Sequence, residues 1–243
     1  MKTAANTLTK RGLYQADWQL PDGVKAFYSS AAFGNLAAHV GDDISSVMRR
    51  RISLTQLLAL PAAPSWLQQV HGSEVAQYGR LGLDKRQADA VYSNSGKPCG
   101  ILTADCLPIL LCHQDGQQLA AVHAGWRGLY LGVVEQAVAR FCGAAKQLSA
   151  WIGPAISAQH FEVGDDVYHA FVQRDETAAA AFQALPQTAK WLCNLPLLAE
   201  LRLRAVGVTL VKQSQLCSYA DSRFYSYRRQ PDCGRMLSLI WRA

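Results

Sequence analysis

Two apolar runs separated by a short polar segment occupy residues 101–128, in the stretch ILTADCLPILLCHQDGQQLAAVHAGWRG. Its two apolar runs predict β-strands, and the polar segment QDGQ between them contains Asp-Gly, a strong hairpin signal. Cys106 lies on the first run and His123 on the second. A turn that closes near Asp115 and Gly116 brings these two positions nearly opposite each other, so a thiol and an imidazole meet inside an apolar hairpin.

The pattern elsewhere contains both helical and strand-like spacing. Apolar positions three and four apart predict a helix from Ile44, with Asp42 or Asp43 as its N-cap. A second amphipathic helix is expected in NLPLLAELRLRAVGV, and two closing strands are expected in FYSYRR and GRMLSLIW. Residues 86–100 read as a loop, and residues 1–17 as a loosely held N-terminus.

No internal repeat, low-complexity linker or break in composition divides the 243 residues. The strands do not alternate with helices regularly enough for a doubly wound parallel sheet. We therefore expect a single domain over residues 1–243. Its fold class is α+β, with mixed β-sheets flanked by helices.

The charge pattern favours small anions as ligands over nucleic acid. Half of the residues are apolar, 17% are charged and the formal net charge is +6, an ordinary globular composition. Lys and Arg are scattered, and no basic run is interleaved with aromatic residues in the manner of a nucleic-acid-binding module. No apolar run approaches the roughly 20 residues of a membrane helix, so we expect no membrane partner.

The cysteines indicate a reducing compartment. There are seven of them, an odd number at irregular spacings, and the first residues lack the apolar core of a secretion signal. We therefore expect reduced thiols and a cytoplasmic protein.

A second histidine turns the Cys106–His123 pair into a candidate metal centre. His71 ends the apolar run in WLQQVHGSEV, and the three residues are separated by 35 and 17 positions. These intervals differ from the tight pairs of zinc fingers and suit a catalytic zinc site, in which three protein ligands leave a fourth position open. A thiolate with two imidazoles favours Zn²⁺, with Cu²⁺ as the alternative. Chance, and a metal-free nucleophilic pair of Cys106 and His123, remain open explanations.

Two arginines are the candidates for substrate binding. Arg50 and Arg228 could each offer bidentate donors to a phosphate or a carboxylate, and a structurally paired arginine is the alternative for both. Asp105 would point to the opposite face from Cys106 if the segment is extended, so we interpret it as structural rather than as a ligand. The four other histidines lie among polar neighbours and are interpreted as surface or structural residues.

Several segments, in this order, closely resemble the YfiH-like proteins, a family long labelled multicopper polyphenol oxidase or laccase-domain proteins. The resemblance spans about residues 24–241. It rests on WLQQVHGSEV, QADAVYSN, LTADCLPILL, AVHAGWRG, WIGPAIS…FEVG and FYSYRR…GRMLSLIW. The joint occurrence of TADCLP and HAGWRG makes it specific.

The resemblance implies a zinc site made of His71, Cys106 and His123, in a single mixed domain related to Cys–His hydrolases. It implies a zinc-dependent purine nucleoside phosphorylase that converts adenosine, inosine, guanosine or methylthioadenosine with phosphate to base and ribose 1-phosphate. Adenosine deamination accompanies that activity in the family. We expect these small molecules as partners and a monomer or homodimer.

Two other activities are associated with such proteins. A copper-dependent polyphenol oxidase is disfavoured, because a multicopper centre needs on the order of ten His and Cys ligands and the chain has six histidines in all. A Cys106–His123 hydrolase acting on peptidoglycan precursors is the other alternative.

One segment departs from the family pattern. A Ser-x-Arg-x-Gly-Gly loop usually precedes the Asn-Leu turn, whereas FYSSAAFGNL passes almost directly from Ser30 to Asn35 and lacks that arginine. If the loop contacts substrate, we expect a changed affinity or specificity.

Overall fold

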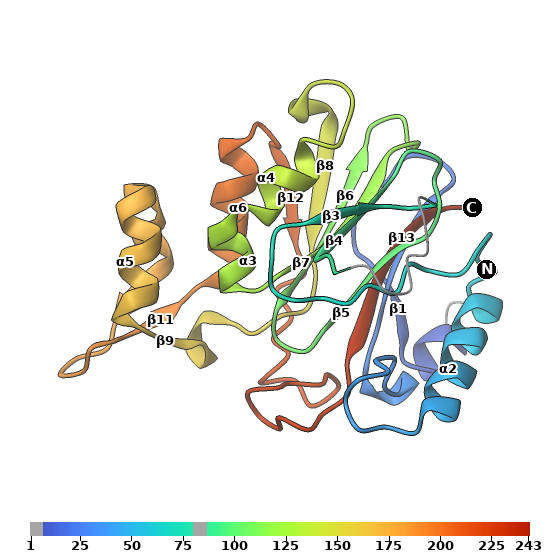
Figure 1. Cartoon of the computed structure of the whole chain (residues 1–243), viewed down its shortest axis with the longest axis horizontal. Helices are drawn as coiled ribbons and strands as arrows, with labels where there is room; N and C mark the ends of the chain where they lie inside the picture. Colours follow the sequence, from blue (N-terminus) through green and yellow to red (C-terminus); the bar gives the residue numbers. More distant parts are fainter. Residues whose placement is uncertain (1–6, 80–86) are drawn as a thin grey trace.

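The computed structural model describes residues 7–79 and 87–243, which form stacked layers (Figure 1). A six-stranded mixed sheet with the order β12-β8-β6-β7-β4-β3 lies at the centre. Two of its pairs, β3–β4 and β8–β12, are parallel, and the remaining pairs are antiparallel. Its strands are β3 (Val75–Gln77), β4 (Ala90–Ser93), β6 (Leu107–His113), β7 (Leu119–Ala124), β8 (Leu148–Ile152) and β12 (Leu210–Gln213).

A four-stranded antiparallel sheet with the order β1-β2-β13-β5 packs on one face of the central sheet. The two sheets share an apolar core that includes Ile101, Leu110, Trp151 and Ile240. The strands of this second sheet are β1 (Leu13–Gln15), β2 (Val24–Ser29), β5 (Cys99–Thr103) and β13 (Met236–Arg242).

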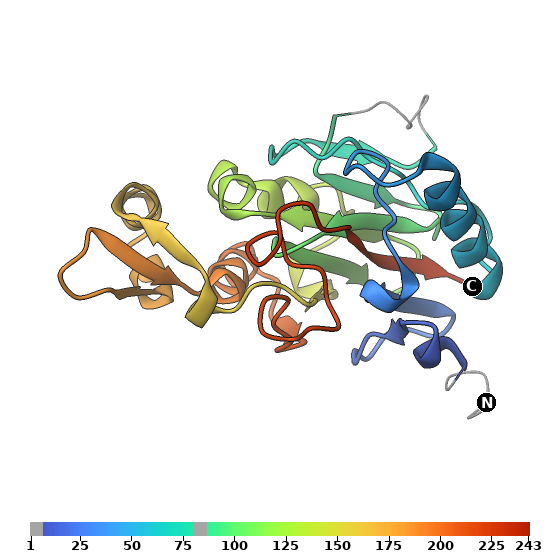
Figure 2. The same cartoon turned by 90° about the horizontal axis from the view of Figure 1, so that it is seen from below.

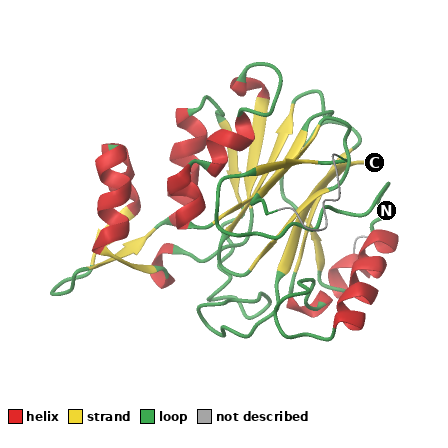
Figure 3. Cartoon of the chain, viewed as in Figure 1, coloured by secondary structure: helices red, strands yellow, loops and turns green. Residues whose placement is uncertain are grey.

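Helices cover the two outer faces (Figures 1 and 3). α3 (Trp126–Leu131), α4 (Val133–Val138) and α6 (Leu195–Ala205) pack on the six-stranded sheet, and α2 (Ile44–Leu57) packs on the four-stranded one. Strands β5, β6 and β7 are therefore buried on both faces. This burial explains why their sequences are almost continuously apolar instead of alternating.

Residues 162–194 form an arm that protrudes beyond the layered body (Figure 2). The arm holds a three-stranded antiparallel sheet of β9 (Glu162–Gly164), β10 (Phe182–Ala184) and β11 (Lys190–Cys193), with α5 (Asp165–Arg174) and the 3₁₀ helix η5 (Glu176–Ala181). Tyr168 stacks on Trp191 inside it, with ring centroids 3.7 Å apart. Within residues 7–79 and 87–243, the other short 3₁₀ helices are η1 (Ala31–Phe33), η3 (Ala145–Gln147) and η4 (Ala158–His160).

The predicted fold class and the longest elements are confirmed. The protein is α+β, with mixed sheets flanked by helices. The predicted hairpin is β6–β7, and Gly116 in its turn has a left-handed φ of 69°. Helix α2 begins at Ile44, and the Asp43 carboxylate accepts a hydrogen bond from the Ser46 N–H as its N-cap. Helix α6 also forms where it was predicted.

Several other predictions were wrong. The first run of the hairpin is not one strand, because the chain leaves β5 at Thr103 and enters β6, in the other sheet, at Leu107. Residues 86–100 contain the whole of β4 and the start of β5 instead of a loop.

The ends of the chain also differ from expectation. Part of the N-terminus expected to be loose is strand β1, which pairs with β2 and buries Leu13; residues 1–6 lie outside the described part. Of the two closing strands, only β13 forms, and FYSYRR lies in turns. None of the helices in the described part is both long enough and apolar enough to cross a membrane.

Candidate metal centre and its cavity

Three segments meet at the junction of the two sheets and bring His71, Cys106 and His123 together. His71 lies in the turn before β3, Cys106 in the turn from β5 to β6, and His123 in β7. The register of the hairpin pairs Leu107 with Ala124, so Cys106 lies one residue beyond the strand, diagonal to His123. One ligand atom from each of the three residues lies within 4.8 Å of the other two.

The group is open on one side. His71 is exposed, Cys106 is half-buried and His123 is buried. The Cys106 Sγ is 3.8 Å from the His71 Nε2, and the two imidazole rings meet edge to face with centroids 4.9 Å apart. A Cβ atom on Gly125 would lie 3.0 Å from the Cys106 Sγ and 3.1 Å from the His71 Cδ2. Only glycine therefore leaves the thiol and the ring this close to the backbone.

Two residues of the site have backbone angles that L-amino acids rarely adopt. His71 has φ 60° and Asp105, beside Cys106, has φ 89°. Residues in this region cost about 1–3 kcal/mol each and are held by their surroundings. Each of these two turns is anchored by a buried carboxylate, and the two anchors are Asp89 and Asp105 itself.

Asp89 was not predicted as a site residue. Its side chain is fully buried and accepts hydrogen bonds from the His123 Nδ1, at 2.8 Å, and from the backbone N–H groups of residues 70–72. An acidic residue between two alanines, directly before a buried strand, is the sequence signal that could have identified it. That signal was hidden because QADAVYSN reads as a polar loop.

Asp105 has the structural role that the sequence indicated, although the extended backbone assumed for it is wrong. Its carboxylate accepts hydrogen bonds from the Ser218 Oγ (2.6 Å), the Ser226 Oγ (3.0 Å) and the Arg228 N–H (2.7 Å). It thereby fixes the turns that precede β13 against the Cys106 turn.

The electrostatics of the group favour a thiolate. Burial alone would raise the pKa of the Cys106 thiol, but His123 and His71 outweigh it and lower that pKa to about 6. Burial likewise opposes protonation of His123, yet Cys106 and Asp89 raise its pKa to about 9. At neutral pH without metal, Cys106 and His123 therefore form an ion pair.

A cavity of 140 Å³ opens beside the group. Apart from His71, Cys106 and Asp105, its lining is mostly apolar: Gly125, Trp126, Arg127, Ile156, Phe161 and Leu195. Phe161 and Leu195 are the residues on either side of the arm. Both ends of the arm therefore join the layered body at the wall of this cavity. An apolar pocket with a few convergent polar groups is the usual form of a small-molecule site.

The arginines divide clearly by position. Arg50 is paired with Asp42 at 2.6 Å, donates to the Asn35 carbonyl and does not line the cavity. Arg228 lies against the wall, with its guanidinium 5.5 Å from the centroid of the Phe161 ring. Arg127 lines the cavity and has no carboxylate partner within residues 7–79 and 87–243. Arg127 was not among the arginines predicted from the sequence to bind substrate.

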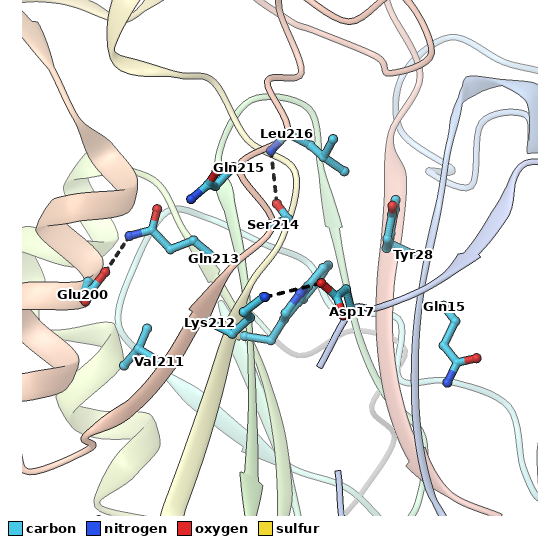
Figure 4. A pocket seen from close by; sticks show the side chains of 11 residues that line it. Gln15, Asp17, Tyr28, Glu200, Val211, Lys212, Gln213, Ser214, Gln215 and Leu216 are labelled. Atoms are coloured by element: carbon cyan, nitrogen blue, oxygen red, sulfur yellow. Dashed lines mark hydrogen bonds and ion pairs between the residues drawn. The ribbon is translucent and has the colours of Figure 1, made fainter. Parts of the chain in front are cut away.

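A larger cavity of 550 Å³ lies elsewhere, between the β1–β2 and β8–β12 edges (Figure 4). Lys212 and Asp17 form an ion pair across it, and Gln213 donates to Glu200. No cysteine or histidine lines it. The thiol and the two imidazoles of the candidate metal centre lie at the smaller cavity.

Comparison with known sequences places the chain in a family. The family model described as multi-copper polyphenol oxidoreductase laccase matches residues 23–243. Purine nucleoside phosphorylase YfiH of Escherichia coli is 41% identical over 235 residues, which are 92% of this chain and 96% of that protein. Purine nucleoside phosphorylase of Haemophilus influenzae is 39% identical over 93% of this chain and 97% of its own length.

Solved structures agree. A Neisseria meningitidis protein of the DUF152 family superimposes with a TM-score of 0.90 and 38% identity, covering 95% of this chain and 98% of that one. A Bacillus licheniformis protein titled YfiH shares the fold, with a TM-score of 0.86 at 20% identity, and covers 97% of this chain and 98% of its own. The chain therefore belongs to the YfiH-like family, described as multi-copper polyphenol oxidoreductase laccase.

Proposed function

We propose that this protein is a purine nucleoside phosphorylase. Adenosine, inosine or guanosine would react with phosphate to give the base and ribose 1-phosphate, and methylthioadenosine would give adenine and 5-methylthioribose 1-phosphate. The names of the relatives at 39–42% identity over more than nine-tenths of the chain support this function. The observation that carries it is the His71–Cys106–His123 group at the mouth of an apolar cavity.

We further propose that the three residues hold a metal ion, with Zn²⁺ first and Cu²⁺ as the alternative. One soft thiolate and two imidazoles are a donor set that suits both ions. The lowered pKa of Cys106 supports metal binding, because the thiol is already ionised near neutral pH. A bound Zn²⁺ would supply Lewis-acid chemistry at this position.

The surrounding residues have the chemistry to bind a nucleoside and phosphate. Trp126 and Phe161 offer ring faces on which a purine can stack. Arg127 and Arg228 offer guanidinium groups that have no carboxylate partner among the described residues, and guanidinium binds phosphate through two parallel hydrogen bonds. Of the two arginines named from the sequence, Arg228 keeps this proposed role and its position supports it. The ion-paired Arg50 is the weaker candidate.

Adenosine deaminase activity is proposed for the same cavity. Deamination replaces the exocyclic amine with oxygen from water, so adenosine gives inosine and ammonia without phosphate. Phosphorolysis of adenosine gives adenine and depends on phosphate. The two activities are therefore separable in a single reaction mixture.

A Cys–His hydrolase is the second candidate, and one observation favours it. Cys106, His123 and Asp89 follow one another as a nucleophile, a base and a carboxylate that orients the base. This is the order of groups found in cysteine hydrolases. Resistance to a chelator, together with inactivation by a thiol alkylator, would favour it over a metal enzyme.

The test is to follow adenosine by chromatography, with and without phosphate, in the wild type, Cys106→Ala and Cys142→Ala. Cys142 is exposed and does not line the cavity, so it is the matched control. We expect the wild type and Cys142→Ala to form adenine only with phosphate and inosine without it, and Cys106→Ala to lose both. Unchanged product formation by Cys106→Ala would reject the site.

A further inference from the structure

The hydrogen bonds accepted by the Asp89 carboxylate come from His123 and from the turn that carries His71. This carboxylate is fully buried and receives four N–H donors. Oδ1 accepts from the His123 Nδ1 at 2.8 Å and from the His71 backbone N–H at 2.9 Å. Oδ2 accepts from the N–H groups of Val70, at 3.2 Å, and Gly72, at 2.7 Å. One oxygen therefore joins the two histidines, and the other completes the loop around His71.

The backbone fixes this carboxylate in place. Asp89 directly precedes β4; its N–H donates to the Glu74 carbonyl at 3.0 Å, and its carbonyl accepts from the His123 N–H at 2.7 Å. Strand β4 pairs with β3 on one side and β7 on the other, and these neighbours carry the His71 turn and His123. Both the main chain and the side chain of Asp89 therefore form hydrogen bonds with the segment that carries His71 and with the segment that carries His123.

We propose that Asp89 is the positioning residue for both imidazoles of the metal-binding group. It holds the proton of His123 on Nδ1, which leaves the Nε2 lone pair for the ion. It also holds the left-handed His71 turn by three backbone bonds, so that the His71 Nε2 faces Cys106. This inference rests on the proposed metal site, and Asp89 itself does not touch the ion or the substrate.

An amide at this position cannot reproduce the arrangement. If the NH₂ group of Asp89→Asn replaces Oδ2, it faces the N–H donors of residues 70 and 72, and the His71 turn loses its anchor. If it replaces Oδ1, it donates to the His123 Nδ1 and drives the proton to Nε2, the atom that should bind the ion. The first orientation displaces the His71 imidazole, and the second leaves the His123 imidazole unable to bind the ion through Nε2.

The first measurement is the affinity for Co²⁺ and Zn²⁺ by competition with a chromophoric chelator. We expect Asp89→Asn to bind 10- to 100-fold more weakly than the wild type, the range for loss of an outer partner of a metal-ligating histidine. Asp42→Asn is the matched control, because Asp42 is also ion-paired but does not contact the group. Equal affinity in Asp89→Asn and the wild type would overturn the proposal.

The second measurement is the visible spectrum of the Co²⁺-loaded proteins, which reports the ligands of the folded fraction only. Loss or displacement of an imidazole changes the d–d bands, whereas simple destabilisation leaves them unchanged. An Asp89→Asn spectrum identical to that of the wild type contradicts a positioning role.

The wild type provides an independent test if Asp89→Asn does not fold. In the Zn²⁺-loaded protein, ¹⁵N shifts of His123 should show a protonated Nδ1 and an unprotonated Nε2, and the opposite tautomer overturns the proposal. A wild type that binds neither ion rejects the metal site and this inference with it. Metal binding without nucleoside turnover rejects only the proposed activity.

Discussion

At the scale of single residues, the site combines strained backbone with buried charge. His71 and Asp105 have φ values of 60° and 89°, which favour glycine. Asp89 anchors the first turn and the Asp105 carboxylate anchors the second. The cost of the strained turns is thus offset by hydrogen bonds to carboxylates beside the three candidate ligands.

The strain at His71 can be measured without metal. Ala and Gly at position 71 both remove the imidazole and differ only in the Cβ atom. Because left-handed backbone costs an L-residue roughly 1–2 kcal/mol, we expect His71→Gly to exceed His71→Ala in free energy of unfolding by about 1 kcal/mol. Urea denaturation of the metal-free proteins measures this difference.

The matched control is Ala199→Gly within α6, where the helical backbone gives the opposite sign, a loss of roughly 1 kcal/mol. A His71→Gly protein less stable than His71→Ala would show that the turn is not strained.

The Cys106 thiolate predicts an unusual pH dependence. With a pKa lowered from 9.0 to about 6, Cys106 should be alkylated by iodoacetamide at a rate that reaches half its maximum near pH 6 in metal-free protein. The lowered pKa also contributes folding stability that is complete above pH 9.0 and lost as the pH falls through about 6.

A Cys142→Ala background removes the competing exposed thiol from this assay. His123→Gln should move the midpoint upward, because it removes the positive charge that stabilises the thiolate. A midpoint near 9 in the parent protein would contradict the ion pair, and protection by Zn²⁺ would connect the thiol to the metal site.

At the scale of elements, what could be predicted depends on how each element is buried. Helix α2 has one apolar face and a capping Asp43, so the sequence identified it directly. The β6–β7 hairpin was identified from Asp-Gly between two apolar runs. The break between β5 and β6 was missed, because both strands are buried on two faces and read as one continuous run.

The burial and shortness of the strands also explain which residue of the site was missed. The prediction placed His71, Cys106 and His123 together, and the structure brings them within 4.8 Å. Asp89 was missed because β4 is only four residues long and lies within a polar segment. Whether a buried carboxylate meets four N–H donors depends on strand pairing that spacing alone does not determine.

Asp105 connects the Cys106 turn to the turns that precede β13, and its removal should loosen the turns before β13. Asp105→Asn replaces one acceptor oxygen by a donor that faces Ser218, Ser226 or the Arg228 N–H. We expect a loss of about 1–3 kcal/mol of unfolding free energy, the cost of unpaired buried polar groups. Urea denaturation gives the energy, and faster hydrogen exchange at residues 218–228 locates it.

Asp221→Asn is the control in the same segment. Asp221 pairs with the half-exposed Arg223, and surface ion pairs contribute at most about 1 kcal/mol. An equal effect of the two variants would mean that Asp105 does not anchor the turns.

At the scale of the whole molecule, the candidate metal-binding group lies where three separate segments meet, so it exists only in the folded chain. An ion that binds only the native state raises stability by about 4 kcal/mol at 1,000 times its dissociation constant. For a domain of this size, each kcal/mol shifts Tm by about 2–4 °C. We therefore expect Zn²⁺ to raise Tm by about 10 °C above the chelator-treated protein, as measured by calorimetry.

The controls separate the site from unspecific binding. Cys106→Ala should show little or no shift in Tm with Zn²⁺, and Cys142→Ala should show the full shift. The same shift in all three proteins would place the ion elsewhere in the molecule.

The arm has a consequence for how specificity can change within the family. It starts directly after Phe161 and ends directly before Leu195, and the Cys193 N–H donates to the Phe161 carbonyl at 2.9 Å, so its two ends meet. Because Phe161 and Leu195 line the cavity and the arm between them does not, an exchange of arms between relatives would act on the cavity only through these two residues at its base. The candidate metal centre and this part of the cavity wall are therefore carried by separate segments of the chain.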